Sequence, residues 1–186
     1  MSAIEAVTPE GILRYTFSDV LTEGPAIFLD RDGVINQQIT GTYVTQWSEF
    51  RFMPDIAGVL TEIAALPFPI IVISNQAGVG KGLLSVAELS SITHGFVRQL
   101  ASRGGRIDAA YYCPHTPQEA CGCRKPKPGL LRRAARDWNI NLTRSVLIGD
   151  SATDVQAAAA AGCQSILLAS GAAFADLPAL VREALY

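Results

Sequence analysis

The sequence predicts an α/β fold, a Rossmann-like three-layer sandwich with a central parallel sheet. Short apolar runs rich in β-branched residues alternate with longer segments of helical spacing along the chain. Such an alternation of strand and helix is typical of a parallel sheet covered by helices. The length of 186 residues is that of one domain of ordinary size.

The expected strands and helices follow from this alternation. Each expected strand is a short apolar run, interpreted as buried on both faces: 26–29, 69–73, 107–112, 146–148 and 165–168. Apolar spacing and alanine content favour helices over 55–66, 85–103, 129–139 and 153–161. Ser85 and Glu88 have the spacing of a capping box, which predicts that the second helix begins there.

Residues 1–24 are expected to be an N-terminal extension of unknown role, ahead of a domain over residues 25–186. Within the extension, 12–17 could form an extra edge strand, half of a hairpin or part of a mobile arm. Residues 1–10 contain acidic residues and no basic stretch leading into an apolar one, so neither a secretory signal nor a transit peptide is evident. We therefore expect a cytoplasmic protein.

Composition excludes several classes of protein. With 49% apolar and 17% charged residues the chain is globular rather than disordered, and no apolar run approaches the roughly 20 residues of a membrane span. The net charge is -2 and no run of Lys or Arg provides the basic face that nucleic acid requires. The expected partner is a small molecule, and the expected state is a monomer.

The most informative motif is F-L-D-R-D-G-V-I-N, which begins at Phe28. Asp30 and Asp32 come where a buried strand ends, and side chains two residues apart in a strand lie on the same face. One carboxylate could attack phosphorus as a nucleophile, and the other could transfer a proton to the leaving group. Standing alone, such a string is more often an Asx-rich turn that closes a strand.

Polar residues also follow two other expected strands. Ser74 and Asn75 end one of them, and Asp150 ends another. Because the carboxyl ends of parallel strands meet at one rim of the sheet, these residues should converge with Asp30 and Asp32. Hydroxyl and amide groups can donate to phosphate, and Asp30 and Asp150 could share a Mg²⁺ ion. Three clusters of polar residues at one rim of the sheet make it less plausible that each cluster is only a turn that closes a strand.

Two nearby patterns are not counted as parts of this rim. The segment 77–82 suggests a P-loop, but that motif requires glycine in place of Asn75 and Ser or Thr in place of Gly82, so nucleotide binding there is rejected. Asp154 follows Asp150 near the start of an expected helix, where an acidic side chain is favourable on helix-dipole grounds alone.

A cluster of metal-ligand residues lies between the expected strands. Three of the four cysteines and one of the two histidines fall within a short stretch: Cys113, His115, Cys121 and Cys123. Cys₃His is a common tetrahedral zinc set, and its short spacings predict a small zinc-stapled loop. A redox pair and coincidence are the alternatives. Cys163 is expected to be a buried thiol and His94 a structural residue.

Arg124 and Lys125 follow directly after this cluster, between prolines that restrict the backbone. Fixed cations close to acidic strand ends indicate a bound anion. The alternative is a solvated basic patch.

Four motifs in this order, D-R-D-G-V-I-N, S-N-Q, R-K-P-K-P and G-D-S-A-T-D, resemble the haloacid-dehalogenase-like (HAD) phosphatase superfamily. The C-P-H…C-x-C loop resembles the branch that holds the D-glycero-D-manno-heptose 1,7-bisphosphate phosphatases and the histidinol-phosphate phosphatases. The resemblance extends over roughly residues 26–168.

The resemblance implies a role for each matching residue. Asp30 would be the nucleophile that forms an aspartyl-phosphate, and Asp32 the general acid that later activates water. Mg²⁺ would be held by Asp30, the backbone carbonyl of Asp32, and Asp150. Ser74 and Lys125 would bind the transferring phosphoryl group, with Lys127 as the alternative lysine.

The resemblance also implies how substrate is admitted. Asn75 and Arg124 would contact the substrate. A structural Zn²⁺ would be held by Cys113, His115, Cys121 and Cys123. Without room for a large cap domain, the site would be open to the phosphate end of a sugar or another small phosphorylated metabolite.

The substrate is less constrained than the reaction. Segments 41–44 and 128–131 resemble the heptose-bisphosphate phosphatases more closely and favour removal of the 7-phosphate, with histidinol phosphate as the alternative substrate. Ser151 departs from the lysine often found there in the heptose branch. A zinc-stapled binding protein without catalysis is an alternative of another class, which the presence of both Asp30 and Asp32 disfavours.

Overall fold

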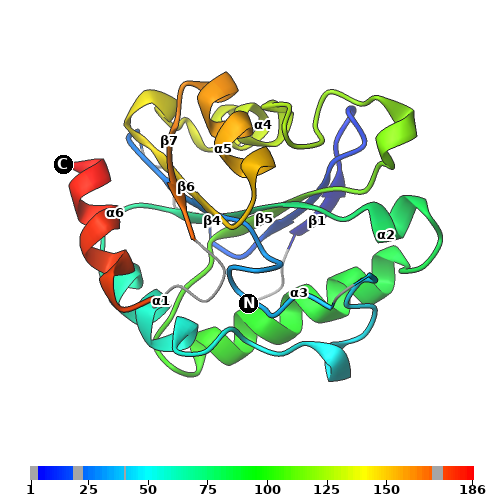
Figure 1. The fold of residues 1–186 in the computed structure, drawn as a ribbon, viewed down its shortest axis with the longest axis horizontal. Coiled ribbons are helices and arrows are strands. Elements are labelled where there is room, and N and C mark those ends of the chain that lie inside the picture. Colours follow the sequence, from blue (N-terminus) through cyan, green and yellow to red (C-terminus); the bar gives the residue numbers. More distant parts are fainter. Residues whose placement is uncertain (1–3, 19–22, 40, 169–173) are drawn as a thin grey trace.

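The computed structural model describes residues 4–18, 23–39, 41–168 and 174–186. Over these residues the chain forms a seven-stranded sheet with helices on both faces (Figure 1). The strands are β1 (Ile4–Val7), β2 (Leu13–Thr16), β3 (Ile27–Leu29), β4 (Ile70–Asn75), β5 (Ala109–Cys113), β6 (Val146–Gly149) and β7 (Gln164–Leu167). The helices are α1 (Ile56–Ala64), α2 (Ala77–Gly80), α3 (Val86–Ala101), α4 (Gly129–Trp138), α5 (Ala152–Ala161) and α6 (Leu177–Leu185).

The sheet has the order β1-β2-β5-β4-β3-β6-β7. Strands β5, β4, β3, β6 and β7 are parallel, and β1 and β2 join antiparallel at one edge. The predicted α/β fold is confirmed, and every expected strand and helix is present with its ends shifted by no more than two residues. Ser85 caps α3 with a complete capping box.

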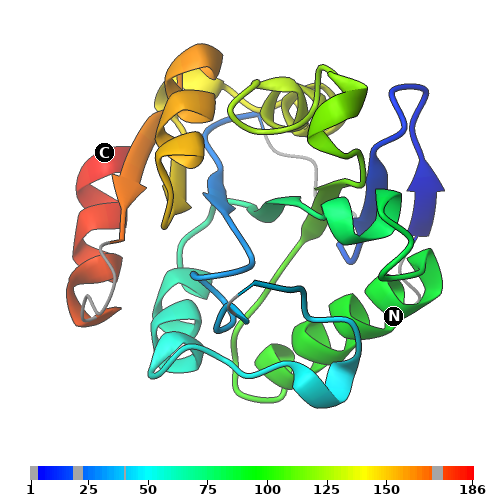
Figure 2. The ribbon, with the colours of Figure 1, turned by 45° about the vertical axis from the view of Figure 1, so that its right-hand side comes forward.

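The two faces of the sheet hold separate hydrophobic clusters because side chains alternate along each strand. In β3, Ile27 and Leu29 belong to the cluster with residues of α1, α3 and α6, whereas Phe28 belongs to the cluster with residues of α4 and α5. Figures 1 and 2 show these helices as the two outer layers. The three-layer arrangement leaves the strand ends free to form a site.

Strand β7 corrects one expectation. It was expected to be buried on both faces, but it lies at the edge of the sheet and Leu167 is 55% exposed. An apolar run in an edge strand is covered on fewer sides than the same run in a central strand.

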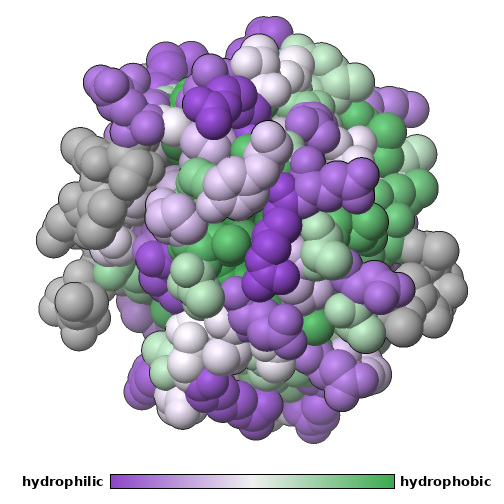
Figure 3. All heavy atoms as spheres, turned by 90° about the vertical axis from the view of Figure 1, so that its left-hand side faces the viewer, coloured by the Kyte–Doolittle hydropathy of each residue, from purple (hydrophilic) through white to green (hydrophobic). Residues whose placement is uncertain are grey.

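The side of the molecule where α6 lies has hydrophilic residues over most of its surface and hydrophobic ones between them (Figure 3). The sequence pattern predicts neither α6 nor the short α2.

The first two strands form a hairpin within the sheet. β2 pairs with β1 on one side and with β5 on the other, where Leu13 lies opposite Tyr112. Of the expected extension 1–24, residues 1–3 and 19–22 lie outside the described residues. Across the described part of the chain, no helix combines the length and apolar character needed to cross a membrane.

Candidate active site and cysteine-histidine cluster

The carboxyl ends of three adjacent strands meet at one cavity of about 240 Å³. Asp30 follows β3, Ser74 and Asn75 end β4, and Asp150 follows β6. The cavity is also lined by Asp32 and Lys125, together with Gln38, Ile39, Thr42, Tyr43, Val44, Ser151 and Thr153. The structure thus brings together the strand-end residues that the sequence placed at this rim.

Lys125 is buried among acidic groups at the base of this cavity. Its Nζ lies 2.9 Å from Asp30 Oδ2 and 2.5 Å from Asp154 Oδ1. It also donates a hydrogen bond of 3.0 Å to the carbonyl oxygen of Ile73. Three acceptors therefore match the three N–H groups of the ammonium, and the Lys125 side chain is fixed against Asp30.

Asp154 is a site residue that sequence reasoning missed. The helix dipole alone could account for an acidic residue near the start of a helix, but the carboxyl group is 1% exposed and pairs with Lys125. Its other oxygen, Oδ2, accepts hydrogen bonds from the backbone and side chain of Ser151. The repeat of an acidic residue four positions after Asp150 was the available signal.

Burial and mutual repulsion raise the pKa of two acidic groups at the cavity. Burial, together with the charges of Asp154 and Asp32, raises the pKa of Asp30 even though Lys125 opposes the shift. Burial and the charges of Asp30 and Asp154 raise the pKa of Asp150 to about 6. For Lys125, burial alone would lower the pKa, but Asp30 and Asp154 outweigh it and the pKa is raised.

The oxygens at this position suit a divalent cation. Ligand atoms of Asp30, Asp150 and Asp154 lie within 4.8 Å of one another. The carbonyl oxygen of Asp32 and Oδ2 of Asp150 converge, because both accept from Gln38 Nε2, at 3.4 and 2.7 Å. Lys125 and Ser151 bond to the two oxygens of Asp154. Asp30, Asp150 and the backbone of Asp32 then provide the carboxylate and carbonyl oxygens that Mg²⁺ prefers.

Gly33 allows this close approach. Its φ of +86° is in the left-handed region, and a Cβ there would lie 1.9 Å from Oδ2 of Asp150. No other residue type fits this position unless the two loops separate. The glycine of the D-x-D-G motif is therefore required both by the turn and by the neighbouring carboxylate.

Three donor side chains, one of them a guanidinium cation, hold the carboxylate of Asp32. Arg31, itself fully buried, donates from Nη2 to both carboxylate oxygens at 2.9 Å. Asn36 Nδ2 donates to Oδ1 at 2.9 Å and Gln76 Nε2 to Oδ2 at 2.8 Å. Burial alone would raise the pKa of Asp32, but these donors outweigh it and the pKa lies below its usual value. Sequence reasoning assigned no role to Arg31, Asn36 or Gln76.

Ser74 and Asn75 differ in what they contact. Ser74 is buried, lines the cavity and accepts a 3.2 Å hydrogen bond from Gln76 Nε2. Asn75 also lines the cavity, but its amide makes two hydrogen bonds to the backbone of Lys125. Arg124 is not among the residues that line this cavity, and its Nη1 lies 3.4 Å from the carbonyl oxygen of His115.

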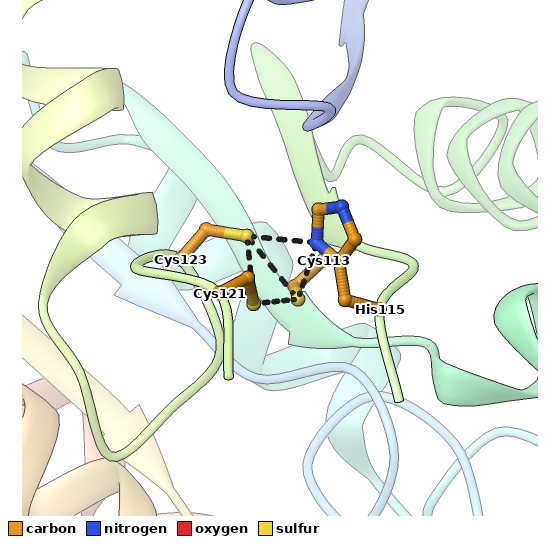
Figure 4. Close-up of side chains that lie close together, drawn as sticks. All are labelled: Cys113, His115, Cys121 and Cys123. Atoms are coloured by element: carbon orange, nitrogen blue, oxygen red, sulfur yellow. Dashed lines mark hydrogen bonds between the residues drawn. The ribbon is translucent and has the colours of Figure 1, made fainter. Parts of the chain in front are cut away.

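The metal-ligand residues meet beside the end of β5 (Figure 4). The sulfur atoms and His115 Nδ1 are separated by 3.3 to 3.6 Å in the pairs that contact one another. The cysteines of the cluster, Cys113, Cys121 and Cys123, are all free thiols. A tetrahedron with ligands about 2.3 Å from its centre has edges of about 3.8 Å. The four side chains therefore match a zinc site more closely than a disulfide.

Two cysteines of the cluster shift in opposite directions, because the contact between Cys113 and Cys123 lowers the pKa of Cys113 and raises that of Cys123. Hydrogen bonding from Cys123, which outweighs burial, lowers the pKa of Cys113 to about 6, and His115 contributes to the same shift. A thiol of that pKa is largely a thiolate at neutral pH, the form that binds metal. Cys163, expected to be a buried thiol, is buried, and burial raises its pKa to about 12.

Comparison with known proteins identifies the family. A family model for HAD-hydrolase-like proteins matches residues 122–182. The D-glycero-alpha-D-manno-heptose-1,7-bisphosphate 7-phosphatase of Mycobacterium tuberculosis (strain CDC 1551 / Oshkosh) is 42% identical over 158 residues, which cover 81% of this chain and 83% of that protein. The chain belongs to the heptose-1,7-bisphosphate 7-phosphatase family of HAD-like hydrolases.

A second relative and two crystal structures are also similar to this chain. The D-glycero-beta-D-manno-heptose-1,7-bisphosphate 7-phosphatase of Bordetella bronchiseptica is 38% identical over 145 residues, covering 78% of this chain and 80% of that protein. A crystal structure of the Bordetella bronchiseptica phosphatase, complexed with magnesium and phosphate, covers 77% of this chain and 79% of that one with a TM-score of 0.74. A crystal structure from Mesorhizobium loti, at 24% identity and a TM-score of 0.84, shares the fold over 98% of this chain and 97% of that one.

Proposed function

We propose that this protein is a Mg²⁺-dependent phosphatase that removes the 7-phosphate of D-glycero-D-manno-heptose 1,7-bisphosphate. The observation that carries the proposal is the placement of Asp30 at the cavity, fixed by Lys125 and close to Asp150. Membership of the heptose-1,7-bisphosphate 7-phosphatase family supports the choice of substrate.

Asp30 is the proposed nucleophile. A carboxylate oxygen of Asp30 forms a bond to phosphorus while the bond from phosphorus to the ester oxygen of the sugar breaks, which leaves an aspartyl-phosphate. Water then attacks the same phosphorus, and the bond to Asp30 breaks to release inorganic phosphate. Lys125 keeps the attacking carboxyl group in place and balances its charge.

Asp32 is the proposed proton-transfer group. In the first step it gives a proton to the departing sugar oxygen, and in the second it accepts a proton from the attacking water. Arg31 and Gln76 hold its carboxylate toward the cavity. Because these donors lower the pKa of Asp32, they favour the deprotonated form that the second step requires and make the protonated form of the first step a stronger acid.

The remaining rim residues hold the phosphate and the cation. Asp30, the carbonyl oxygen of Asp32 and Asp150 would hold Mg²⁺, which when bound neutralises charge on the phosphoryl oxygens. The Ser74 hydroxyl donates a hydrogen bond to the transferring phosphoryl group, and Lys125 supplies a positive charge beside that group. Asn75 acts through Lys125, whose backbone it binds.

The cysteine-histidine cluster is proposed to hold a structural Zn²⁺. Its geometry and the low pKa of Cys113 support this assignment. Cys123 precedes Lys125 by two residues, so the metal would fix the chain segment that delivers the lysine to Asp30. Arg124, between them, is oriented toward the cluster rather than the cavity by its contact with the His115 carbonyl group.

A substrate panel tests the proposed function. Phosphate release with Mg²⁺ should be fastest with heptose 1,7-bisphosphate, and both anomers belong in the panel because the Mycobacterium and Bordetella relatives are an α and a β enzyme. Histidinol phosphate is the comparison substrate. Faster hydrolysis of histidinol phosphate would replace the proposed substrate, and no hydrolysis of any phosphate ester would favour a binding protein.

A further inference from the structure

The turn of the N-terminal hairpin lies against the imidazole ring of His115. A Cβ on Gly11 would be 2.8 Å from Nε2 and 3.0 Å from Cε1 of that ring. The opposite nitrogen, Nδ1, faces the sulfur atoms of Cys113 and Cys123 at 3.5 and 3.3 Å. Figure 4 shows the blue hairpin turn above the ring, on the side away from the sulfur atoms. The hairpin therefore covers the edge of the His115 ring that faces away from the sulfur atoms.

The turn is itself fixed by hydrogen bonds and ion pairs. Thr8 accepts from the backbone N–H of Gly11 at 2.8 Å and donates its own backbone N–H to Ile12 at 2.9 Å. Glu10 reaches helix α4, where its carboxylate pairs with Arg133 at 2.8 Å and with Arg136 at 2.9 Å. The backbone hydrogen bonds define the shape of the turn, and the ion pairs link it to α4.

The hairpin also shares its packing with the proposed metal ligands. Ile12 is 1% exposed and belongs to the hydrophobic cluster that contains Cys113 and Cys123. Strand β2 pairs directly with β5, whose last residue is Cys113. One segment therefore covers the histidine and supports the strand that ends in the first cysteine.

We propose that the hairpin of residues 4–16 is a positioning element of the metal site, which holds His115 in its ligand orientation and slows the loss of zinc. This inference rests on the proposed zinc site. The physical reason is that a ligand imidazole must keep one ring orientation, and groups packed around the first ligands commonly change metal affinity by about 10- to 100-fold. The hairpin does so by contact with the edge of the His115 ring.

A pair of glycine substitutions tests the proposal. Gly11→Ala introduces a methyl group in contact with the His115 ring, whereas Gly82→Ala introduces one at φ +69°, close to the +75° of Gly11, where nothing lies within 4 Å. Both variants carry the same kind of backbone strain, so the contact with the ring is what differs between them. Zinc content is measured in each purified protein, and zinc release is followed with a chromophoric chelator.

Gly11→Ala should release zinc about 10-fold or more faster than the wild type, and Gly82→Ala should release it at the wild-type rate. Equal rates in the two variants would overturn the proposal. If Gly11→Ala does not fold, Glu10→Gln weakens the anchor of the turn on α4, and release no faster than the wild type there would overturn it as well. A wild-type protein without zinc would instead refute the zinc site itself, whereas absent phosphatase activity with zinc bound would refute only the proposed function.

Discussion

Asn75 makes both of its side-chain hydrogen bonds to the backbone of Lys125. Oδ1 accepts from the backbone N–H of Lys125 at 3.0 Å, and Nδ2 donates to its carbonyl oxygen at 3.1 Å. The amide therefore joins the end of β4 to the segment that follows the cysteine-histidine cluster. Through this contact Asn75 determines where the Lys125 side chain starts.

Asn75→Ala should lower kcat by about 10- to 100-fold, because displacement of a catalytic group by about 1 Å can cost about 100-fold. KM should change little, since the Asn75 amide is already bound to the protein. Steady-state kinetics on the bisphosphate measure both constants. An increase in KM at unchanged kcat would instead show that Asn75 binds substrate directly.

Asp154→Asn should lower the free energy of unfolding by about 2 kcal/mol, because the buried Lys125 ammonium and the Ser151 donors lose a charged hydrogen-bond acceptor. Lys125 would keep Asp30 as a partner. Urea denaturation measures the change, and Asp176→Asn is the matched control because Asp176 is exposed. A loss of the same size in both variants would contradict the role given to the buried pair.

Much of the fold could be predicted from the sequence, because the periodicity of apolar residues and the polar residues at strand ends are local signals. The alternation of apolar runs was sufficient for the order of strands and helices, and Asp30, Ser74 and Asp150 could be placed at one rim because parallel strands share an orientation. Strand β7 was misjudged because the composition of a run does not report its position in the sheet.

Contacts between distant segments were not predictable in this way. Arg31 is buried against Asp32, although an arginine between two aspartates has the pattern of a solvated turn. The position of Asp154 near the start of a helix is enough to explain an acidic residue there, and its contact with Lys125 appears only in the folded structure. The contact of Gly11 with His115 joins residues that no local pattern relates.

Binding of Mg²⁺ should weaken below pH 6. In the metal-free protein the pKa of Asp150 is about 6, raised from a usual value of 3.8, so protons compete with the cation for this carboxylate. The apparent Kd should rise about 10-fold for each pH unit below 6 for one displaced proton. Isothermal titration calorimetry at pH 5, 6 and 7.5 measures it, and a pH-independent Kd would contradict the assignment of Asp150 as a ligand.

The same raised pKa fixes the sign of a stability effect. Because the folded protein binds this proton more tightly than the unfolded chain, the metal-free protein loses stability as the pH rises from about 4 through about 6. Saturating Mg²⁺ should remove that loss. Thermal unfolding with and without Mg²⁺ across this pH range should give curves that separate as the pH increases.

Cys121→Ala should abolish stoichiometric zinc binding, because the Cys₃His set loses one of its ligands. Cys163→Ala is the matched control, since Cys163 is a buried thiol outside the cluster. Elemental analysis of the purified proteins should find about one zinc per chain in the wild type and in the control. Equal zinc in both variants would place the metal elsewhere.

The covalent step at Asp30 can be tested by trapping the aspartyl-phosphate that it forms. The protein is mixed with heptose 1,7-bisphosphate and Mg²⁺ and quenched with borohydride, which reduces an aspartyl-phosphate to homoserine, and peptide mass spectrometry locates the change. Homoserine is expected at position 30 of the wild type and not in Asp30→Asn, which should also be inactive. Phosphate release by Asp30→Asn at the wild-type rate, with no residue reduced in either protein, would contradict the covalent step.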